Sequence, residues 1–487
     1  MSEVNLKEVA VSGMMWNGIQ KYSIIIISFV SSIVLARLLT PYDYGCIGML
    51  EIFIAVATIL IDGGFGAALL QKKRPTQEDY STIFYWNMVV SIVFYIILFV
   101  SAPFIAKFYN IPILSTVLRV QGLVLFVNAL KMIQSNQLRK QFRFKPIAIV
   151  VITSSVVTMI VTVFLAYLGF GVWALVTQNL LIAILPMIAF WLITGWTPSF
   201  LFSKKSFKEL FSFGGFMFLT DIINTTSDNL QGLLIGKVYN PSIMGYYAKA
   251  KSTEGLSSNG ISMVISSVTL QLYSEVQDDL KTLINIIKRI TTSLAYITFP
   301  LIISLIFLAK PIFIILYSER WLPSVLFFQI LALAGFAICL QSVNLQAIAA
   351  IGKSKVMFKW TLIKRIIGIV LLISGLVADG IIGLLVGMVI SAWIAYFINA
   401  WLVDRHIGYK LIDQFKDLLP IILTTLASIV PALAYRWIFK INMYVDALIM
   451  TVVFCTIYMA ISKLLKLDAY SYCVDLVPLV LKKIKRK

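Results

Sequence analysis

The sequence predicts an all-α protein that crosses a membrane many times. Of its 487 residues, 60% are hydrophobic and only 13% are charged, whereas soluble domains are about half apolar and a quarter charged. The mean hydropathy is +0.92. The apolar residues gather in runs of about 20, the length that a helix needs to cross a bilayer. We therefore expect about 14 transmembrane helices, joined by loops too short to form a soluble domain.

These runs fall in three groups along the chain. The first six span approximately 12–35, 46–70, 81–102, 113–134, 147–168 and 172–194. The next six span approximately 211–235, 246–271, 286–309, 323–346, 357–378 and 381–402, and the last two 418–437 and 444–464. The first run is too long for the apolar core of a signal peptide, so we expect it to stay in the protein. The loop 195–209 joins the first two groups, and we expect it to act as a hinge.

The loops divide the positive charges unevenly between the two sides of the membrane. When the loops are sorted by parity, about three quarters of the 41 Lys and Arg lie on one side. The positive-inside rule places that side, with both termini, in the cytoplasm. It also explains the net charge of +19 without a nucleic-acid partner, since the basic run 139–145 (RKQFRFK) and the tail 482–487 (KKIKRK) belong to this side.

One motif occurs twice, 200 positions apart. LARLLTPYDYG at 35–45 aligns with IGKVYNPSIMG at 235–245, which pairs Arg37 with Lys237, Pro41 with Pro241 and Gly45 with Gly245. Six spans separate the copies, so the two halves share one orientation and are related by a pseudo-twofold axis, as in transporters with parallel repeats. We predict an N-lobe at 1–200, a C-lobe at 201–403, and a third region at 404–487 with the last two helices and a basic cytoplasmic tail. Topology places both motif copies at the outer surface, where the cations would form a rim or gate and the prolines and glycines would set tight turns.

Ionisable residues inside the spans are the functional candidates, because each costs about 2.5–3.5 kcal/mol at the centre of a bilayer. One helical face of the run 211–235 carries Asp221, Asn224 and Asp228 at three- and four-residue spacing. The other candidates for a substrate cavity are Lys21, Glu51, Arg119, Lys249, Lys251 and Glu254. The cations suit an amphiphile with a phosphate-bearing head. The alternative is that these groups pair with one another and only hold helices together.

Signals for catalysis or metal binding are missing from the sequence. The single histidine, His406, lies in a loop, the four cysteines are isolated, and no phosphate-binding loop occurs. Gly63, Gly64 and Gly66 lie at a helix end, where close packing explains them. We therefore expect no catalytic residue, no metal and no bound cofactor.

Two stretches resemble a known family. LARLLTPYDYG and the segment 62–87, DGGFGAALLQKKRPTQEDYSTIFYWN, are similar to the polysaccharide-transporter branch of the multidrug/oligosaccharidyl-lipid/polysaccharide (MOP) flippase superfamily, which includes O-antigen, colanic-acid and capsule-unit flippases. The resemblance implies a MATE-like fold of two six-helix lobes and movement of undecaprenyl-pyrophosphate-linked sugar units across the bacterial cytoplasmic membrane by alternating access. It implies coupling to a gradient of H⁺ or Na⁺, with Asp62, Asp221 and Asp228 as candidate sites, and cations that meet the pyrophosphate. Polysaccharide polymerase and chain-length proteins are possible further partners.

Two other classes of function stay open. An ion-coupled drug or metabolite exporter of the same fold would need a smaller and more acidic cavity. A membrane polysaccharide polymerase or ligase would be expected to carry a long external loop with catalytic cations, and the predicted loops are short.

Overall fold

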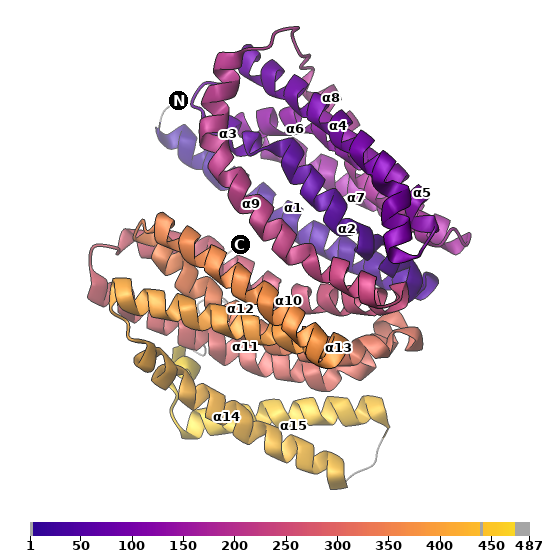
Figure 1. Ribbon diagram of the computed structural model, residues 1–487. Helices are drawn as coiled ribbons and strands as arrows, with labels where there is room; N and C mark the ends of the chain where they lie inside the picture. Colours follow the sequence, from indigo (N-terminus) through magenta and orange to yellow (C-terminus); the bar gives the residue numbers. More distant parts are fainter. Residues whose placement is uncertain (1–2, 439–441, 473–487) are drawn as a thin grey trace. The chain divides into compact units, whose positions relative to one another are not determined.

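The computed structural model describes residues 3–438 and 442–472, so the basic tail 482–487 lies outside the described residues. Within them every regular element is a helix (Figure 1). The helices are α1 (Glu3–Leu38), α2 (Pro41–Asp62), α3 (Phe65–Gln71), α4 (Gln77–Tyr109), α5 (Ile113–Gln121), α6 (Leu123–Lys140), α7 (Phe144–Tyr167), α8 (Val172–Thr194), α9 (Lys204–Val238), α10 (Pro241–Glu275), α11 (Leu280–Tyr317), the 3₁₀ turn η1 (Glu319–Trp321), α12 (Pro323–Ala350), α13 (Ser354–Ile407), α14 (Leu411–Ile438) and α15 (Met443–Leu464). The prediction of an all-α membrane protein is confirmed.

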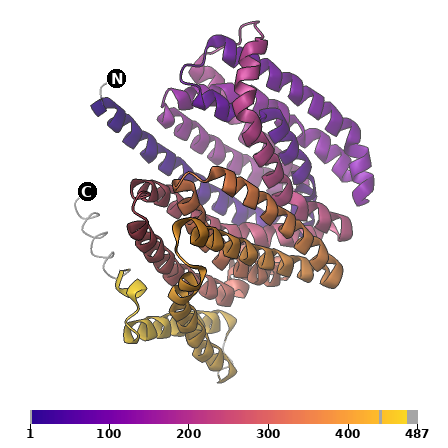
Figure 2. The same cartoon turned by 60° about the vertical axis from the view of Figure 1, so that its left-hand side comes forward.

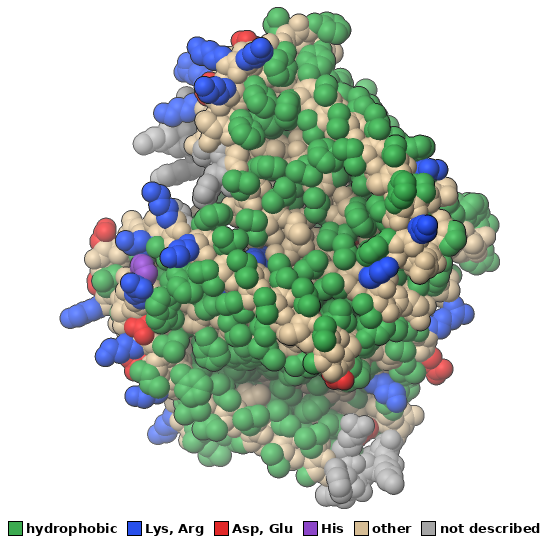
Figure 3. Space-filling view, viewed as in Figure 1, with side chains coloured by type: hydrophobic (Ala, Val, Ile, Leu, Met, Phe, Trp, Pro, Cys, Tyr) green, Lys and Arg blue, Asp and Glu red, His purple; other side chains and the backbone are tan. Residues whose placement is uncertain are grey.

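Within the described ranges, eleven helical segments are long and apolar enough to cross a membrane. One of them, α13, contains both runs predicted at 357–378 and 381–402. Its backbone leaves helical geometry between the two runs, at Asp379 and Gly380. The chain folds back there, so that Gly375 and Gly383 lie against each other. α9 and α10 span the predicted runs 211–235 and 246–271 but are less apolar, so the number 14 stays a prediction. Figure 3 shows hydrophobic side chains over most of one face, as expected of a surface that meets lipid.

The helices form two compact units, Met1–Ala248 and Lys249–Lys487. In the first unit α1 packs along α7, α2 along α9, and α8 along α6 and α7. In the second unit α12 packs against α11 and α13, and the paired helices α14 and α15 both contact α11 (Figures 1 and 2). Helix α9, the first helix of the second sequence repeat, thus packs with the helices of the first repeat. The boundaries predicted at 200 and 403 describe the repeat and stay a prediction.

The run predicted at 46–70 is broken in the structure. α2 ends at Asp62 and α3 begins at Phe65. Between them Gly63 and Gly64 have φ of +56° and +76°, a left-handed conformation that residues with a Cβ rarely adopt. The Gly63 N–H still donates to the Ile59 carbonyl at 2.9 Å and closes α2. The break brings the Gly64 backbone against α9, as described below.

The segment between α8 and α9 is fastened to the start of α4. The hydroxyls of Ser81 and Ser199 lie 2.9 Å apart, and the Ser203 N–H donates to the Thr82 hydroxyl at 3.0 Å. The ring of Trp196 packs edge-on against the ring of Phe84 on α4, at 5.8 Å between centroids. We therefore do not assign the predicted hinge to this segment.

Both copies of the repeated motif begin a helix. Thr40 caps α2, since its backbone N–H donates to Asp43 Oδ2 at 2.9 Å and its hydroxyl accepts from the Asp43 N–H. Asn240 caps α10, since its side-chain Oδ1 accepts a hydrogen bond from the Ile243 N–H at 3.0 Å. Pro41 and Pro241 occupy the first helical position, where a missing N–H costs no hydrogen bond. The two prolines thus lie at the turns, as predicted.

Gly45 and Gly245 have a different role from the predicted one. Each lies one turn inside its helix, not in the turn before it. A side chain at Gly45 would overlap the carbonyl of Pro241, and a side chain at Gly245 would overlap the carbonyl of Pro41. The two copies therefore pack against each other reciprocally, at a separation that only glycine allows. Such an exchange of equivalent contacts is what twofold symmetry produces.

Candidate functional site

Helix α9 touches the α2–α3 segment at two glycine contacts. A Cβ placed at Gly214 would lie 2.7 Å from the carbonyl oxygen of Gly64, and one at Gly232 would lie 2.9 Å from that of Gly48. The two contacts are about 27 Å apart along α9, at 1.5 Å per residue. This length is close to the hydrocarbon thickness of a bilayer, ~30 Å. The backbones of α9 and α2–α3 thus approach closely near both ends of a span.

The polar face predicted on α9 lies between these two contacts. Gly214, Asp221, Asp228 and Gly232 follow one another at steps of seven, seven and four residues, so they share one side of the helix. Asp221 and Asp228 are exposed, and Asn224 is half-buried. The structure therefore places a polar strip, which we define as Asp221, Asn224 and Asp228, on the side of α9 that carries the two glycine contacts.

Asp62, at the end of α2, is an acidic group close to one end of this strip. Its carboxylate is half-buried and accepts hydrogen bonds from the backbone N–H groups of Gly64 and Gly66. It also lies within electrostatic range of Asp221. Two ionised carboxylates at such a range repel each other, and a proton or a cation relieves this repulsion. Two of the three predicted ion-coupling candidates are thus brought together.

A cavity of about 470 Å³ adjoins Asp62 inside the first unit. Its walls come from α2, α3, α4 and α6, and its polar lining includes Asn87, Lys131, Asn136 and Arg139. Asn87 is only 1% exposed, and its Oδ1 has no hydrogen-bond partner among the described residues. Leaving a buried polar atom unpaired costs about 1–3 kcal/mol. The cavity is therefore suited to a ligand that donates hydrogen bonds.

Apart from Asp62, sequence reasoning missed the residues that line this cavity. The positive-inside rule accounts for Arg139 by its charge alone, and Asn87 lies in a largely apolar run. A signal was present on α6, where Asn128, Lys131, Ser135 and Arg139 recur at three- and four-residue spacing. That spacing places them on one helical face.

Three other predicted residues of the first unit lie outside this cavity. Lys21 on α1 and Glu51 on α2 are exposed. The guanidinium of Arg119 lies 4.4 Å from the centre of the Phe99 ring, and its Nε donates to the Phe99 carbonyl at 3.3 Å. Arg119 is thus anchored to α4.

The cations of the repeated motif end their helices. Lys237 lies 4.0 Å over the ring of Phe108 and donates to the carbonyl of the same residue at 2.8 Å. It therefore ties the end of α9 to the end of α4. Arg37 is exposed in the last turn of α1. The role of the motif as an outer gate stays a prediction.

Two of the candidates on α10 are buried within the second unit. Lys249 is 2% exposed, and its ammonium lies 4.1 Å and 5.5 Å from the ring centres of Tyr317 and Trp321. Glu254 is also buried and accepts a hydrogen bond from the Ser258 hydroxyl at 2.5 Å. Lys251, which lies between these two residues in the sequence, is half-buried. The aromatic rings around Lys249 favour a role in packing for this cation.

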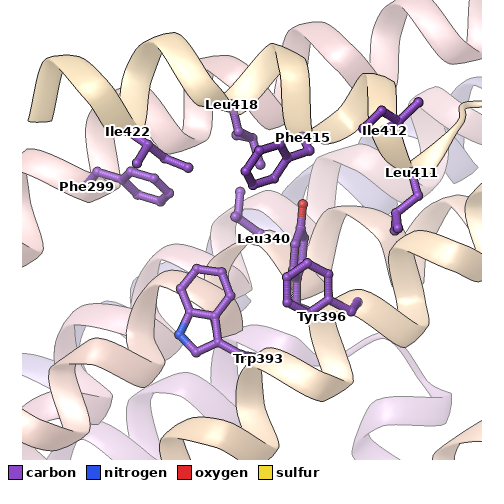
Figure 4. Close-up of a pocket in the computed structure, with 10 residues that line it drawn as sticks. Phe299, Leu340, Trp393, Tyr396, Leu411, Ile412, Phe415, Leu418 and Ile422 are labelled. Atoms are coloured by element: carbon purple, nitrogen blue, oxygen red, sulfur yellow. The ribbon is translucent and has the colours of Figure 1, made fainter. Parts of the chain in front are cut away.

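An apolar groove in the second unit was not predicted. It has a volume of about 190 Å³ and lies between α11, α12, α13 and α14. Figure 4 shows Trp393 and Tyr396 of α13 on one side of it, with Phe299 and Phe415 across. A second apolar hollow of about 350 Å³ shares Leu411 with it. Such walls suit a hydrocarbon chain.

The fold is that of a multi-pass membrane protein, with polar and ionisable groups placed between long helices. Residues 34–326 match the family described as "Polysaccharide biosynthesis protein", and the chain belongs to this family. The teichuronic acid biosynthesis protein TuaB of Bacillus subtilis is 24% identical over 86% of this chain and 87% of its own length. The lipopolysaccharide biosynthesis protein WzxC of Escherichia coli is 22% identical over 81% and 82%.

Among solved structures, the lipid II flippase MurJ in an inward closed conformation matches with a TM-score of 0.76 at 16% identity, covering 93% of this chain and 98% of its own. This likeness shows the fold. Together with the family match, it confirms the resemblance to MOP flippases.

Proposed function

We propose that this protein is a flippase that moves lipid-linked oligosaccharide units across the bacterial cytoplasmic membrane for the synthesis of a surface polysaccharide. The family, the polysaccharides named for its relatives and the flippase fold support this proposal. The observation that carries it is the polar strip on α9, which lies along the helix between the two glycine contacts with the α2–α3 segment.

The two glycine contacts would open in turn. A contact between two backbones involves no interlocked side chains, so it parts without the repacking that a core of large residues requires. Opening at Gly64 and Gly214 would admit the head of the substrate from one side of the membrane, and opening at Gly48 and Gly232 would release it on the other. This is alternating access at the level of two helices.

Each part of the substrate has a matching surface. The polyprenyl chain would stay in the apolar groove of the second unit, where Trp393, Tyr396 and Phe415 offer an apolar wall. The sugars would meet the amides of the cavity beside Asp62. Cations such as Lys131 would pair with the pyrophosphate, because charge-assisted hydrogen bonds to phosphate oxygens are strong.

An ion gradient would drive the cycle. Asp62, Asp221 and Asp228 are the candidate sites for H⁺ or Na⁺, since a carboxylate at membrane depth is favoured only when it is protonated or paired. Under the positive-inside rule both termini lie in the cytoplasm, and a polysaccharide polymerase with its chain-length protein would receive the delivered units.

Complementation of a deletion strain tests the function. Asp221→Asn and Asp228→Asn should each lower surface polysaccharide at least tenfold and cause a lipid-linked sugar to accumulate on the cytoplasmic side, with protein levels unchanged. Asp278→Asn, the same replacement in the exposed turn before α11, is the matched control and should behave as the wild type. Normal polysaccharide in both strip variants would overturn the assignment. Accumulation of lipid-linked units on the outer side would indicate a polymerase or ligase, and no accumulation would indicate an exporter.

A further inference from the structure

A charged groove in the second unit lies on the same turns of α14 as the apolar groove but is lined by different residues. It has a volume of about 530 Å³ and is formed by residues 285–292 of α11, residues 416–421 of α14 and the segment that follows α15. Its lining includes Lys288 and Arg289 on α11, Lys416 and Asp417 on α14, and Lys466 after α15. We call it the basic groove.

The positive charge of the basic groove exceeds its negative charge. Asp417 is engaged twice, by the Lys288 ammonium at 2.7 Å and by the Tyr409 hydroxyl at 2.6 Å. This pair of Lys288 and Asp417 leaves three cations, Arg289, Lys416 and Lys466, against the single carboxylate of Asp468. Among the residues that the structure describes, none of these three cations forms an ion pair. An anion is therefore the favoured occupant.

Arg289 is held in place without losing its charge. Its guanidinium lies 4.0 Å from the centre of the Tyr472 ring. A cation–π contact fixes the position of a guanidinium and leaves its N–H groups free to bind phosphate oxygens. The groove is thus partly organised for an anion before one binds.

Part of the remaining lining of the basic groove is apolar, and the groove lies near the ends of the predicted transmembrane segments. Ile286, Pro420 and Leu467 line it beside the cations. The transmembrane segments of α11 and α14 begin at Leu280 and Leu411, and α15 ends at Leu464, so the groove lies at the boundary between apolar and polar chain. Basic pockets between helices on the cytoplasmic side are the kind that bind acidic lipid head groups. A soluble anion has no apolar part that could pack against these side chains.

We propose that the basic groove binds the phosphate-bearing head of a membrane amphiphile, and that this head fastens α14 and α15 to α11. Two sources share this chemistry. One is an anionic phospholipid of the bilayer, and its binding would not depend on the proposed transport function. The other is a polyprenyl pyrophosphate lipid, which rests on the proposed function.

Binding to the full-length protein in detergent tests the proposal, with phosphatidylglycerol, phosphatidylcholine, a polyprenyl pyrophosphate and inorganic pyrophosphate as separate probes in native mass spectrometry. The variant Arg289→Gln/Lys416→Gln/Lys466→Gln removes the three cations. The control Lys281→Gln/Lys359→Gln/Lys410→Gln removes three exposed lysines of the same unit that do not line the groove. All six side chains are exposed, so both variants should fold, and unchanged melting temperatures would show it.

We expect phosphatidylglycerol or the polyprenyl pyrophosphate to bind at least tenfold more tightly than phosphatidylcholine to the wild type and the control, and the groove variant to lose this preference. Preference for phosphatidylglycerol identifies the bilayer lipid, and preference for the polyprenyl pyrophosphate alone identifies the substrate lipid. Equal losses in the groove variant and the control would overturn the proposal, because they indicate general surface charge. Binding of inorganic pyrophosphate as tight as that of either lipid would also overturn it. The assay measures no transport, so its failure leaves the proposed function untouched.

Discussion

The replacement Gly214→Ala should open the contact between α9 and Gly64. The added Cβ would lie 2.7 Å from the Gly64 carbonyl oxygen, whereas ordinary contact begins at 3.4 Å. Since a packed interior has no spare room, the two backbones would have to part by about 0.7 Å. Overpacking of this kind costs about 1–3 kcal/mol, so we expect the equilibrium between closed and open forms to shift about 5- to 150-fold towards open.

Thiol labelling measures that opening. In a variant without native cysteines, Asp221→Cys reports access to the polar strip from either face of sealed membrane vesicles. We expect Gly214→Ala to raise labelling by a membrane-impermeant maleimide at least fivefold from the side on which Gly214 lies. Gly215→Ala is the matched control, because the nearest atoms to a Cβ at Gly215 belong to the Phe211 ring, at an ordinary contact distance of 3.5 Å. Equal labelling in the two alanine variants would refute the reasoning.

Three further predictions concern other parts of the chain. Hydrogen bonds from the Thr282 hydroxyl and N–H lower the pKa of Asp279, the cap of α11, from 3.8. Its stabilising effect is therefore present above pH 3.8 and fades as the pH falls through the lower folded value, so the melting temperatures of the wild type and Asp279→Ala should differ at pH 7 and converge in acid. Lys249→Met should keep at least half of the transport rate, measured as surface polysaccharide, since Lys249 is buried among aromatic rings; complete loss would show that it contacts the substrate. A disulfide between Ser81→Cys and Ser199→Cys, whose native hydroxyls are 2.9 Å apart, should leave transport intact, and inhibition would restore the hinge to this segment.

The sequence predicts most of the helical architecture because the bilayer imposes a strong and simple rule. Runs of about 20 apolar residues become helices, and most predicted runs fall within a helix of the structure. The break at Gly63 and Gly64 was not foreseen, since glycines are tolerated inside transmembrane helices. Backbone conformation at such a pair depends on what packs against it, here Gly214 of α9.

The candidate site was only partly predictable. The strip of Asp221, Asn224 and Asp228 follows from helical periodicity alone. The association of Asp62 with Asp221, and the cavity that contains Asn87 and Lys131, depend on which helices are neighbours. A single sequence does not show which helices pack against one another. Counting charges could not show that the side chain of Lys131 lines a cavity.

The reciprocal contact of the two motif copies bears on how such a chain can arise. A surface in which residue 45 meets residue 241 while residue 245 meets residue 41 is isologous, the kind formed by two identical subunits around a twofold axis. A polypeptide with one copy of the motif already contains both partners of this contact and could pair with itself. Duplication and fusion would convert that dimer interface into an internal one, after which each half is free to change its polar residues separately. The difference between the acidic strip on α9 and the single Lys21 at the corresponding depth of α1 is what such divergence would produce.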